Sequence, residues 1–357
     1  MHIDTPNARA FELVGDALVA LDGFQQSKER QQLEKATCHL QEAIKEDPEY
    51  LRAIYYMGVA QDLIGKPKDA VNKFTEVLNG LKGVSLVQTP AFPIEVRYNL
   101  GTAYYHCYSK EELDKAAEFF TSVTEQTKEK TIRNLAYASL AQTYAQRMIH
   151  REKADDYANK AEEAAKNALN DVRVYLIRTF LNWLSFSPIE LETLWIAYNA
   201  RGLVAMYLSD DFSDFRQGTR CYQQKIKDLE EAEHYFNTAL RYSYDNWAIY
   251  CNLGSTHMRR GYWMKQQTDP SLPYSEKFDK ARDYLKDVTK RLRPNYGFAL
   301  YEIGRTHRLQ GQWEKAICYF EQALNIEESS RNVSDKTVKR ELSLAKNNDD
   351  AFRLPPS

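Results

Sequence analysis

The segment 297–328 limits what this 357-residue chain can fold into more than any other part of the sequence. Each half of it carries apolar and small residues at spacings of three and four, which place them on one face of a helix. The first half has Leu300, Ile303, Gly304 and His307, and the second half has Ala316, Phe320 and Ala323. Gly311 stands between the halves, where a helix ends and the chain turns. We therefore expect two antiparallel helices that cross closely at Gly304 and Ala316, where a bulky side chain would push the backbones apart.

This pattern resembles the tetratricopeptide repeat (TPR), a 34-residue pair of helices. Its first helix carries an aromatic residue or Leu, followed by Leu-Gly and then Tyr. Its second helix carries Ala, then an aromatic residue, then a second Ala. The resemblance implies an all-α fold: a single right-handed superhelix, or α-solenoid, of about six to seven helix pairs over residues 8–328. The expected repeats are 8–50, 51–84, 94–128, 134–173, 195–244, 247–294 and 297–328. A capping helix and a frayed tail are expected in residues 329–357, because the last repeat needs a cover for its apolar face.

Several repeats depart from this pattern. In the first, Phe11, Val14, Gly15 and Leu18 are expected on the buried face of the first helix, and the extra residues near 23–31 lengthen the helices or their connection. Longer insertions fall in the fourth, fifth and sixth repeats, and they would gather along one edge as a second surface. The apolar segment 172–188 is expected to form an extra helix packed on the solenoid, or else a surface for dimerisation or partner docking.

The composition excludes several classes of protein. The chain has 48 Lys and Arg against 50 Asp and Glu, so no overall basic excess attracts it to nucleic acid or anionic lipid. Its five cysteines are widely spaced and form no C-x-x-C pair, which argues against a disulfide framework and favours a reduced compartment. The N-terminus does not resemble a secretory signal, and no apolar run is long enough to span a membrane. A cytoplasmic protein without membrane contact is expected.

The sequence predicts no enzymatic activity, no cofactor and no metal site. Motifs for zinc proteases, phosphate-binding loops, nucleophile elbows and dinucleotide binding are all missing from the sequence. His257 and His307 fall where the family has Tyr, so we expect them to pack on helix faces rather than bind a metal or transfer protons. His106 and Cys107 are adjacent, and neighbours on a helix point about 100° apart, so they form no catalytic pair.

The resemblance implies a binding function, because a TPR superhelix exposes the first helix of each repeat on its concave side. The side chains expected to face this groove are Arg52, Tyr55, Tyr56, Tyr98, Asn99, Thr102, Tyr105, Asn252, Ser255, Arg259, Tyr301, Arg305 and Arg308. Asn99 and Asn252 match positions where family members often use Asn to bind a peptide backbone, since an amide both donates and accepts hydrogen bonds. The expected partner is another protein, bound as a peptide, helix or loop, with this chain as a scaffold, adaptor or regulatory subunit.

One specific partner is disfavoured. Some TPR proteins bind the acidic C-terminal tails of chaperones through Lys, Asn and Arg, but the equivalent positions here include Glu12, Asp16 and Glu95. Two alternatives stay open: a regulator that senses a peptide or small ligand, and a subunit of a larger nucleic-acid-handling or defence complex. The second would touch nucleic acid only indirectly, and the local basic residues at 259–260 and 290–293 keep it open.

Overall fold

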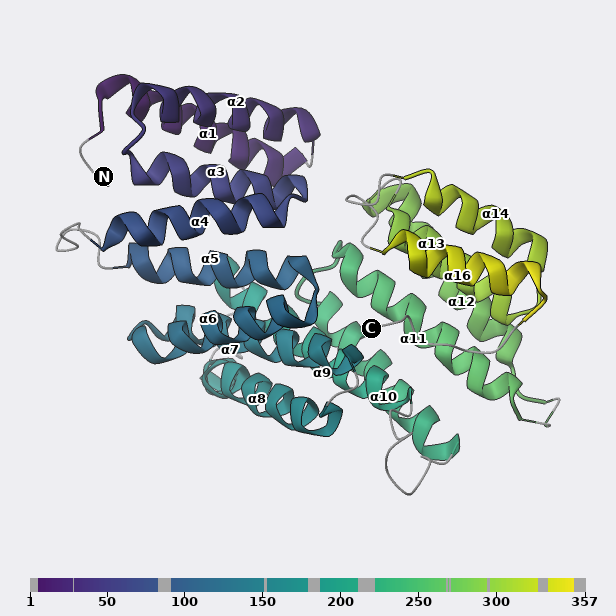
Figure 1. Ribbon diagram of the computed structural model, residues 1–357. Helices are drawn as coiled ribbons and strands as arrows, with labels where there is room; N and C mark the ends of the chain where they lie inside the picture. The colour runs from purple at the N-terminus through teal and green to yellow at the C-terminus, as the bar shows by residue number, and fades with distance from the viewer. Residues whose placement is uncertain are drawn as a thin grey trace. The chain divides into compact units, whose positions relative to one another are not determined.

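The computed structural model describes residues 6–27, 29–82, 91–150, 153–178, 187–210, 222–267, 269, 271–293, 296–326 and 333–349. The regular elements in these residues are all helices (Figure 1). The chain divides into two compact units, Met1–Thr143 and Tyr144–Ser357, with the boundary inside one helix. Each unit is an α-solenoid of antiparallel helix pairs, as the sequence predicts. The continuity of one superhelix over residues 8–328 stays a prediction.

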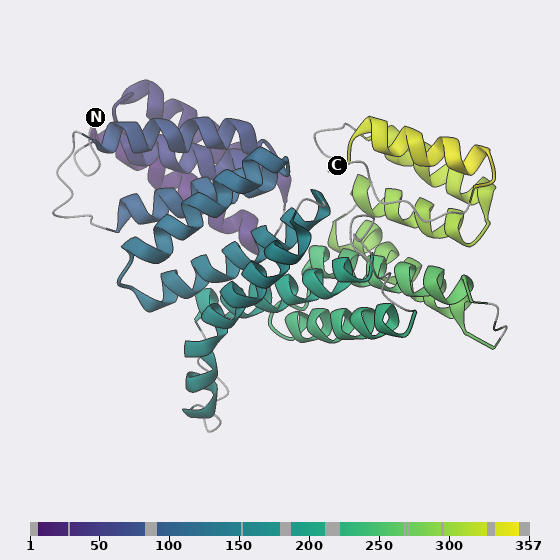
Figure 2. The ribbon, with the colours of Figure 1, turned by 60° about the horizontal axis from the view of Figure 1, so that its bottom comes forward.

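The N-terminal unit contains three helix pairs and most of a seventh helix. Its helices are α1 (Ala8–Ser27), α2 (Arg30–Glu46), α3 (Leu51–Ile64), α4 (Pro67–Leu81), α5 (Phe92–Cys107), α6 (Lys110–Gln126) and α7 (Lys130–Arg147). The first helices α1, α3 and α5 contact one another in one layer, and each packs on the second helix of its own pair (Figures 1 and 2). Gly65 ends α3 with φ of +89°, and Pro67 begins α4, where a missing N–H costs no helical bond.

The C-terminal unit repeats this arrangement. Its helices are α8 (Ala154–Arg178), α9 (Pro188–Leu208), α10 (Tyr222–Leu240), α11 (Trp247–Lys265), α12 (Tyr274–Asp287), α13 (Gly297–Leu309), α14 (Trp313–Leu324) and α16 (Asp335–Lys346), with a 3-10 turn at Met148–His150 and a π-helical turn at Val288–Leu292. Here α9, α11, α13 and α16 form the layer of first helices, because each contacts the next.

In four of the pairs, a glycine on the first helix lies so close to a ring on the second that a Cβ would come within 3.0 Å of it. A Cβ added to Gly58, Gly101, Gly202 or Gly304 would lie between 2.5 and 2.9 Å from the ring of Phe74, Phe120, Phe236 or Phe320, respectively. The sequence predicts a close approach at Gly304 and Ala316. Gly304 makes room for the Phe320 ring, and Ala316 is fully buried in the core beside it.

The expected buried face of α1 is wrong. Val14 is buried, but Phe11 is 64% exposed and Leu18 is 39% exposed. A Cβ on Gly15 would meet nothing within 4 Å, so no side chain of the second helix packs on this glycine. The residues that pack inward are Ala10, Leu13, Val14, Ala17, Ala20 and Leu21. The extra residues of the first repeat lengthen α1 and α2 to 20 and 17 residues.

The end of the fourth repeat also differs from the expectation. Helix α8 runs without interruption to Arg178, so residues 172–178 are its last turns rather than the start of an extra helix. The remainder of the expected extra helix, 179–186, lies outside the described residues. Ser187 then caps α9 through a reciprocal bond with Glu190.

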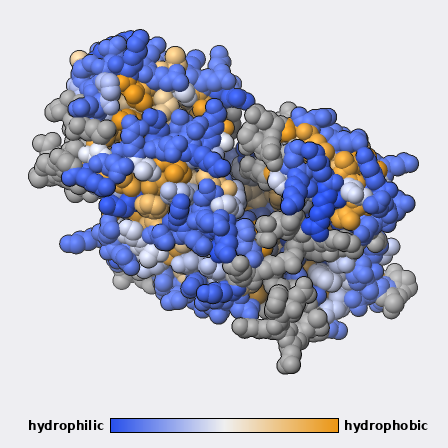
Figure 3. Space-filling model, viewed as in Figure 1, coloured by the Kyte–Doolittle hydropathy of each residue, from blue (hydrophilic) through white to orange (hydrophobic). Residues whose placement is uncertain are grey.

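Helix α16 is the C-terminal cap that the sequence predicts. Val338 and Ala345 are buried with Tyr301 and Phe320, while the opposite side of α16 carries polar side chains. The expected frayed tail, 350–357, lies outside the described residues. In the face drawn in Figure 3, hydrophilic residues predominate, and apolar patches lie between them over helices of both units.

Candidate functional site

Three hydrogen bonds join the first helices of successive repeats in the N-terminal unit. The amide Nδ2 of Asn99 donates to the Tyr55 hydroxyl at 2.6 Å, which connects α5 to α3. Toward α7, the hydroxyls of Tyr98 and Ser139 lie 3.0 Å apart, and Gln142 donates to the Tyr105 hydroxyl at 2.9 Å. We call the surface formed by Arg52, Tyr55, Tyr56, Tyr98, Asn99, Thr102 and Tyr105 the tyrosine face. All seven were predicted to face the groove; they lie on α3 and α5, and these bonds involve Tyr55, Tyr98, Asn99 and Tyr105.

The tyrosine face is half-buried and remains accessible at most positions. Tyr55 is buried, whereas Arg52, Tyr56, Tyr98, Asn99, Thr102 and Tyr105 are all partly exposed. Burial, and then the charge of Glu95, raise the pKa of Tyr55 and of Tyr56, so both hydroxyls stay protonated near neutral pH. The face therefore presents neutral phenols and an amide, with Arg52 and Glu95 as its nearby charges.

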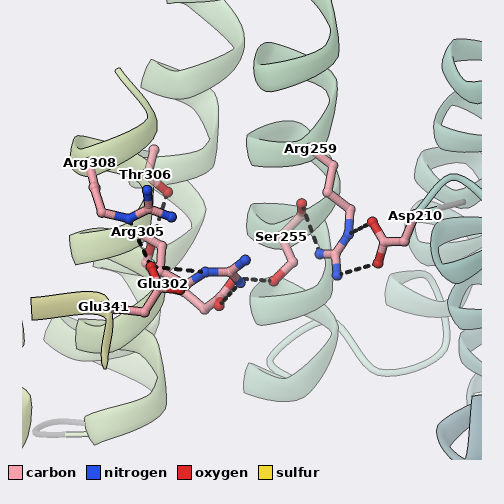
Figure 4. Close-up of polar contacts among 8 residues, drawn as sticks. All are labelled: Asp210, Ser255, Arg259, Glu302, Arg305, Thr306, Arg308 and Glu341. Carbon is pink, nitrogen blue, oxygen red and sulfur yellow. Dashed lines mark hydrogen bonds and ion pairs between the residues drawn. The ribbon is translucent and has the colours of Figure 1, made fainter. Parts of the chain in front are cut away.

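The matching layer of the C-terminal unit contains a row of buried charges (Figure 4). Arg259 on α11 donates to both carboxylate oxygens of Asp210, at 2.7 and 2.9 Å. On α13, Arg305 donates to Glu302 at 2.7 Å, and Arg308 donates to Glu341 of α16 at 2.8 Å. Each of the three arginines therefore has a carboxylate partner, and the row carries no net charge.

Burial of these charges is tolerated because each one is paired. Burial alone would lower the pKa of Arg259, but the carboxylate of Asp210 raises it, so Arg259 stays charged. Ser255 extends the row by donating to Glu302 at 2.8 Å, which connects α11 to α13. Breaking one pair would leave a buried charge without its partner, which commonly costs about 3–5 kcal/mol.

A pocket of ≈ 120 Å³ opens beside this row, on the layer of first helices. Its polar lining comes from Gln146, Asp210, Asn252, Ser255, Arg259, Glu302 and Arg305, and its apolar lining from Ile149, Met206, Tyr207 and Phe298. The pocket lies entirely within the C-terminal unit. It is the point where α9, α11 and α13 come together with the end of α7.

The predicted groove residues of this unit divide into two sets. Asn252, Ser255, Arg259 and Arg305 all line the pocket, and Asn252 donates to Asn199 at 2.9 Å. Tyr301 and Arg308 do not line it, and both are 0% exposed where α13 meets the cap α16. Their contact with a partner stays a prediction.

Sequence reasoning missed Asp210 and Glu341, two of the acidic residues of the row. Asp210 follows the end of α9, in a stretch that the sequence assigned to an insertion, so no helical periodicity marked it. Glu341 did leave a signal: it falls on the same face of α16 as Val338 and Ala345, where an isolated acid is out of place unless it is paired. Ser139 and Gln142, on the first helix of the fourth repeat, were also missed.

The two histidines at the family's Tyr position are packed as expected. His257 stacks on Tyr284, and His307 stacks on Tyr319, in each case on the second helix of the same repeat. Burial lowers the pKa of both imidazoles to about 4, so they are neutral at physiological pH. Within the described residues, no group of three His, Cys, Asp or Glu side chains is placed to hold a metal ion.

Residues 299–334, which form the last helix pair, match the sequence model of the tetratricopeptide repeat family. The last helix pair of this chain is a tetratricopeptide repeat. The crystal structure of a TPR protein from Parabacteroides merdae has the same fold, with 15% sequence identity and a TM-score of 0.54 over 95% of this chain and 99% of that one. No curated protein sequence matches the chain.

Two further solved structures align with most of this chain, with lower scores. The TPR domain of P58(IPK) is 14% identical over 93% of this chain and 98% of that domain, with a TM-score of 0.29. Yeast Tom70 is 13% identical over 94% of this chain and 89% of its own, with a TM-score of 0.20. The TPR fold itself is that of a protein-interaction scaffold. None of the helices described here is long and apolar enough to cross a membrane.

Proposed function

We propose that this TPR protein is a non-catalytic scaffold, adaptor or regulatory subunit that binds a segment of another protein on its first helices. The observation that carries this proposal is the tyrosine face, whose partly exposed side chains are fixed by bonds from one repeat to the next. The reduced, cytoplasmic compartment proposed for it agrees with four free cysteines among the described residues.

The physical basis of the proposal is preorganisation. Tyrosine offers a large contact area with only two rotatable side-chain bonds, so ordering it on binding costs little entropy. Bonds such as Tyr105 to Gln142 and Asn99 to Tyr55 fix the rings before a partner arrives, which lowers that cost further. Tyrosine and arginine are also the residues most enriched at the energetic centres of protein interfaces.

The two rival functions have less support. Pockets for drug-sized ligands have volumes of about 300–1,000 Å³. The pocket in the C-terminal unit measures ≈ 120 Å³, which is small for a sensor of such a ligand. Among the basic residues that kept a nucleic-acid role open, Arg259 and Arg260 both have carboxylate partners inside the unit, and Arg291 lies 3.8 Å from the carboxylate of Asp287.

The test compares two neighbouring tyrosines on α5. Tyr105 belongs to the tyrosine face, whereas Tyr104 stacks on Phe119 of the second helix α6. We would purify tagged wild type, Tyr105→Ala and Tyr104→Ala from the native cell and quantify co-purified proteins by mass spectrometry. A stoichiometric partner lost with Tyr105→Ala and kept with Tyr104→Ala would support the proposal. A partner lost with neither variant, or no protein partner at all, would contradict it.

A further inference from the structure

We infer that the pocket between α9, α11 and α13 holds one uncharged side chain of the bound segment, of the size of leucine, methionine or glutamine. This inference rests on the proposed function, since it specifies what part of a protein partner enters the C-terminal unit. It is carried by the volume of the pocket, the pairing of its charges and the chemistry of its walls.

The volume sets the size of the occupant. At ≈ 120 Å³ the pocket is slightly smaller than the engineered cavity of about 150 Å³ that binds benzene. A side chain of four or five heavy atoms fits such a space, whereas a nucleotide or a folded element does not. The occupant is therefore a single anchoring side chain, of the kind that dominates the binding energy of many interfaces.

The charges on the pocket wall exclude an ionised occupant. The carboxylate of Asp210 already accepts two bonds from Arg259, and the carboxylate of Glu302 accepts bonds from Arg305 and Ser255. Two positive and two negative groups therefore face the pocket. An incoming Asp, Glu, Lys or Arg would lose its water and gain no unpaired counter-charge, which costs several kcal/mol for a buried ion.

The remaining lining residues favour an uncharged side chain that forms few hydrogen bonds. Ile149, Met206, Tyr207 and Phe298 supply apolar contacts. At the polar side, Asn252 donates one amide hydrogen to Asn199, and its carbonyl oxygen still has acceptor capacity. Leucine and methionine would use the apolar walls, and the amide of glutamine could also donate to Asn252.

The experiment selects ligands without assuming the natural partner. Full-length protein is immobilised and used to enrich a displayed library of random twelve-residue peptides. Enriched peptides are labelled, and their affinities are measured by fluorescence anisotropy. Ile149→Trp fills the pocket with a larger side chain, and its matched control is Ile189→Trp, at a 38% exposed position at the start of α9 that does not line the pocket. Circular dichroism verifies that both variants fold.

We expect the enriched peptides to share one uncharged anchor position. Ile149→Trp should weaken their binding at least tenfold, and Ile189→Trp should change it less than twofold. Replacement of the anchor by Ala should cost about tenfold, and replacement by Asp or Lys at least a hundredfold. If Ile149→Trp does not fold, Phe298→Ala takes its place, since enlarging the pocket should also weaken a fitted anchor.

Three outcomes would overturn the inference. An acidic or basic anchor whose binding is lost in Ile149→Trp would place a charged side chain in the pocket and refute the uncharged class. Peptides that bind equally well to Ile149→Trp would show that they bind elsewhere, which refutes the pocket and leaves the proposed function intact. A library without any enriched peptide would count against both.

Discussion

Arg259 and Asp210 form a two-bonded ion pair inside the C-terminal unit, with Nε to Oδ1 at 2.7 Å and Nη2 to Oδ2 at 2.9 Å. Arg259 belongs to a first helix, and its partner comes from the turn after α9. The pair therefore connects two successive repeats at the wall of the pocket. A buried ion pair can contribute little net free energy to folding. Removal of only one partner is nevertheless strongly destabilising, because the other charge stays buried and unpaired.

We predict that Arg259→Met destabilises the C-terminal unit by about 3–5 kcal/mol, because it leaves the Asp210 carboxylate buried without its counter-charge. The double variant Asp210→Leu/Arg259→Met should recover much of this loss. All five tryptophans, at positions 183, 195, 247, 263 and 313, lie in this unit, so urea unfolding followed by tryptophan fluorescence reports on it directly. A single variant as stable as wild type, or a double variant as unstable as the single, would contradict the prediction.

The glycine contacts predict opposite effects for the same substitution at two positions. Gly101→Ala should destabilise the N-terminal unit by about 1–3 kcal/mol, because the new Cβ would lie 2.9 Å from the Phe120 ring. Gly15→Ala should be neutral or stabilise by up to about 1 kcal/mol, because its Cβ meets nothing within 4 Å and Ala favours a helix. Thermal unfolding followed by circular dichroism measures both, and equal effects would refute the assigned register of α1.

The attachment of the C-terminal cap depends on Glu341. We predict that Glu341→Ala loosens α16, because Arg308 and Arg305 lose the carboxylate that lies 2.8 and 3.9 Å from their Nε atoms. Hydrogen exchange of the full chain should show amides of α16 exchanging at least tenfold faster. The control on the same helix is Asp335→Ala, whose exposed ion pair with Lys339 contributes little. Unchanged protection in Glu341→Ala would show that apolar contacts alone fix the cap.

The buried histidines predict a loss of stability as the pH falls. Burial lowers the folded-state pKa of His257 and His307 to about 4, below the value of about 6.5 in the unfolded chain, so the unfolded state binds protons first. Stability is therefore full above pH 6.5, and each histidine should cost about 1 kcal/mol by pH 5.5. His307→Gln should remove roughly half of the loss attributed to the two histidines, as measured by urea unfolding at pH 7.5 and 5.5. An unchanged pH dependence in this variant would contradict the assignment.

Much of the fold could be predicted from the sequence because helical spacing is local information. Gly304 marked the first helix of its repeat, and in the structure a phenylalanine of the second helix packs on it, as on Gly58, Gly101 and Gly202. The prediction was wrong at Gly15, where no side chain packs on the glycine. Gly15 fits the spacing of the motif, but spacing cannot distinguish a glycine beneath a ring from one on an exposed helix face.

The candidate sites were predictable in part. Asn99 and Tyr55, which bond to each other, were both predicted on the groove, and so were Arg259 and Arg305. Glu302 lies three residues before Arg305 on the same helix, so helical spacing does connect that pair, whereas no spacing in the sequence connects residues 210 and 259. Which polar group satisfies another across two elements is a tertiary property, and helical periodicity does not encode it.

The central claim, that another protein binds along the tyrosine face, is tested most directly by site-specific photo-crosslinking in the native cell. A photoreactive phenylalanine analogue would replace Tyr56, on that face, or Glu76, on the second helix α4 of the same repeat. We predict one protein crosslinked in high yield from position 56 and little from position 76. Crosslinks from position 76 alone, or equally from both positions, would contradict the claim.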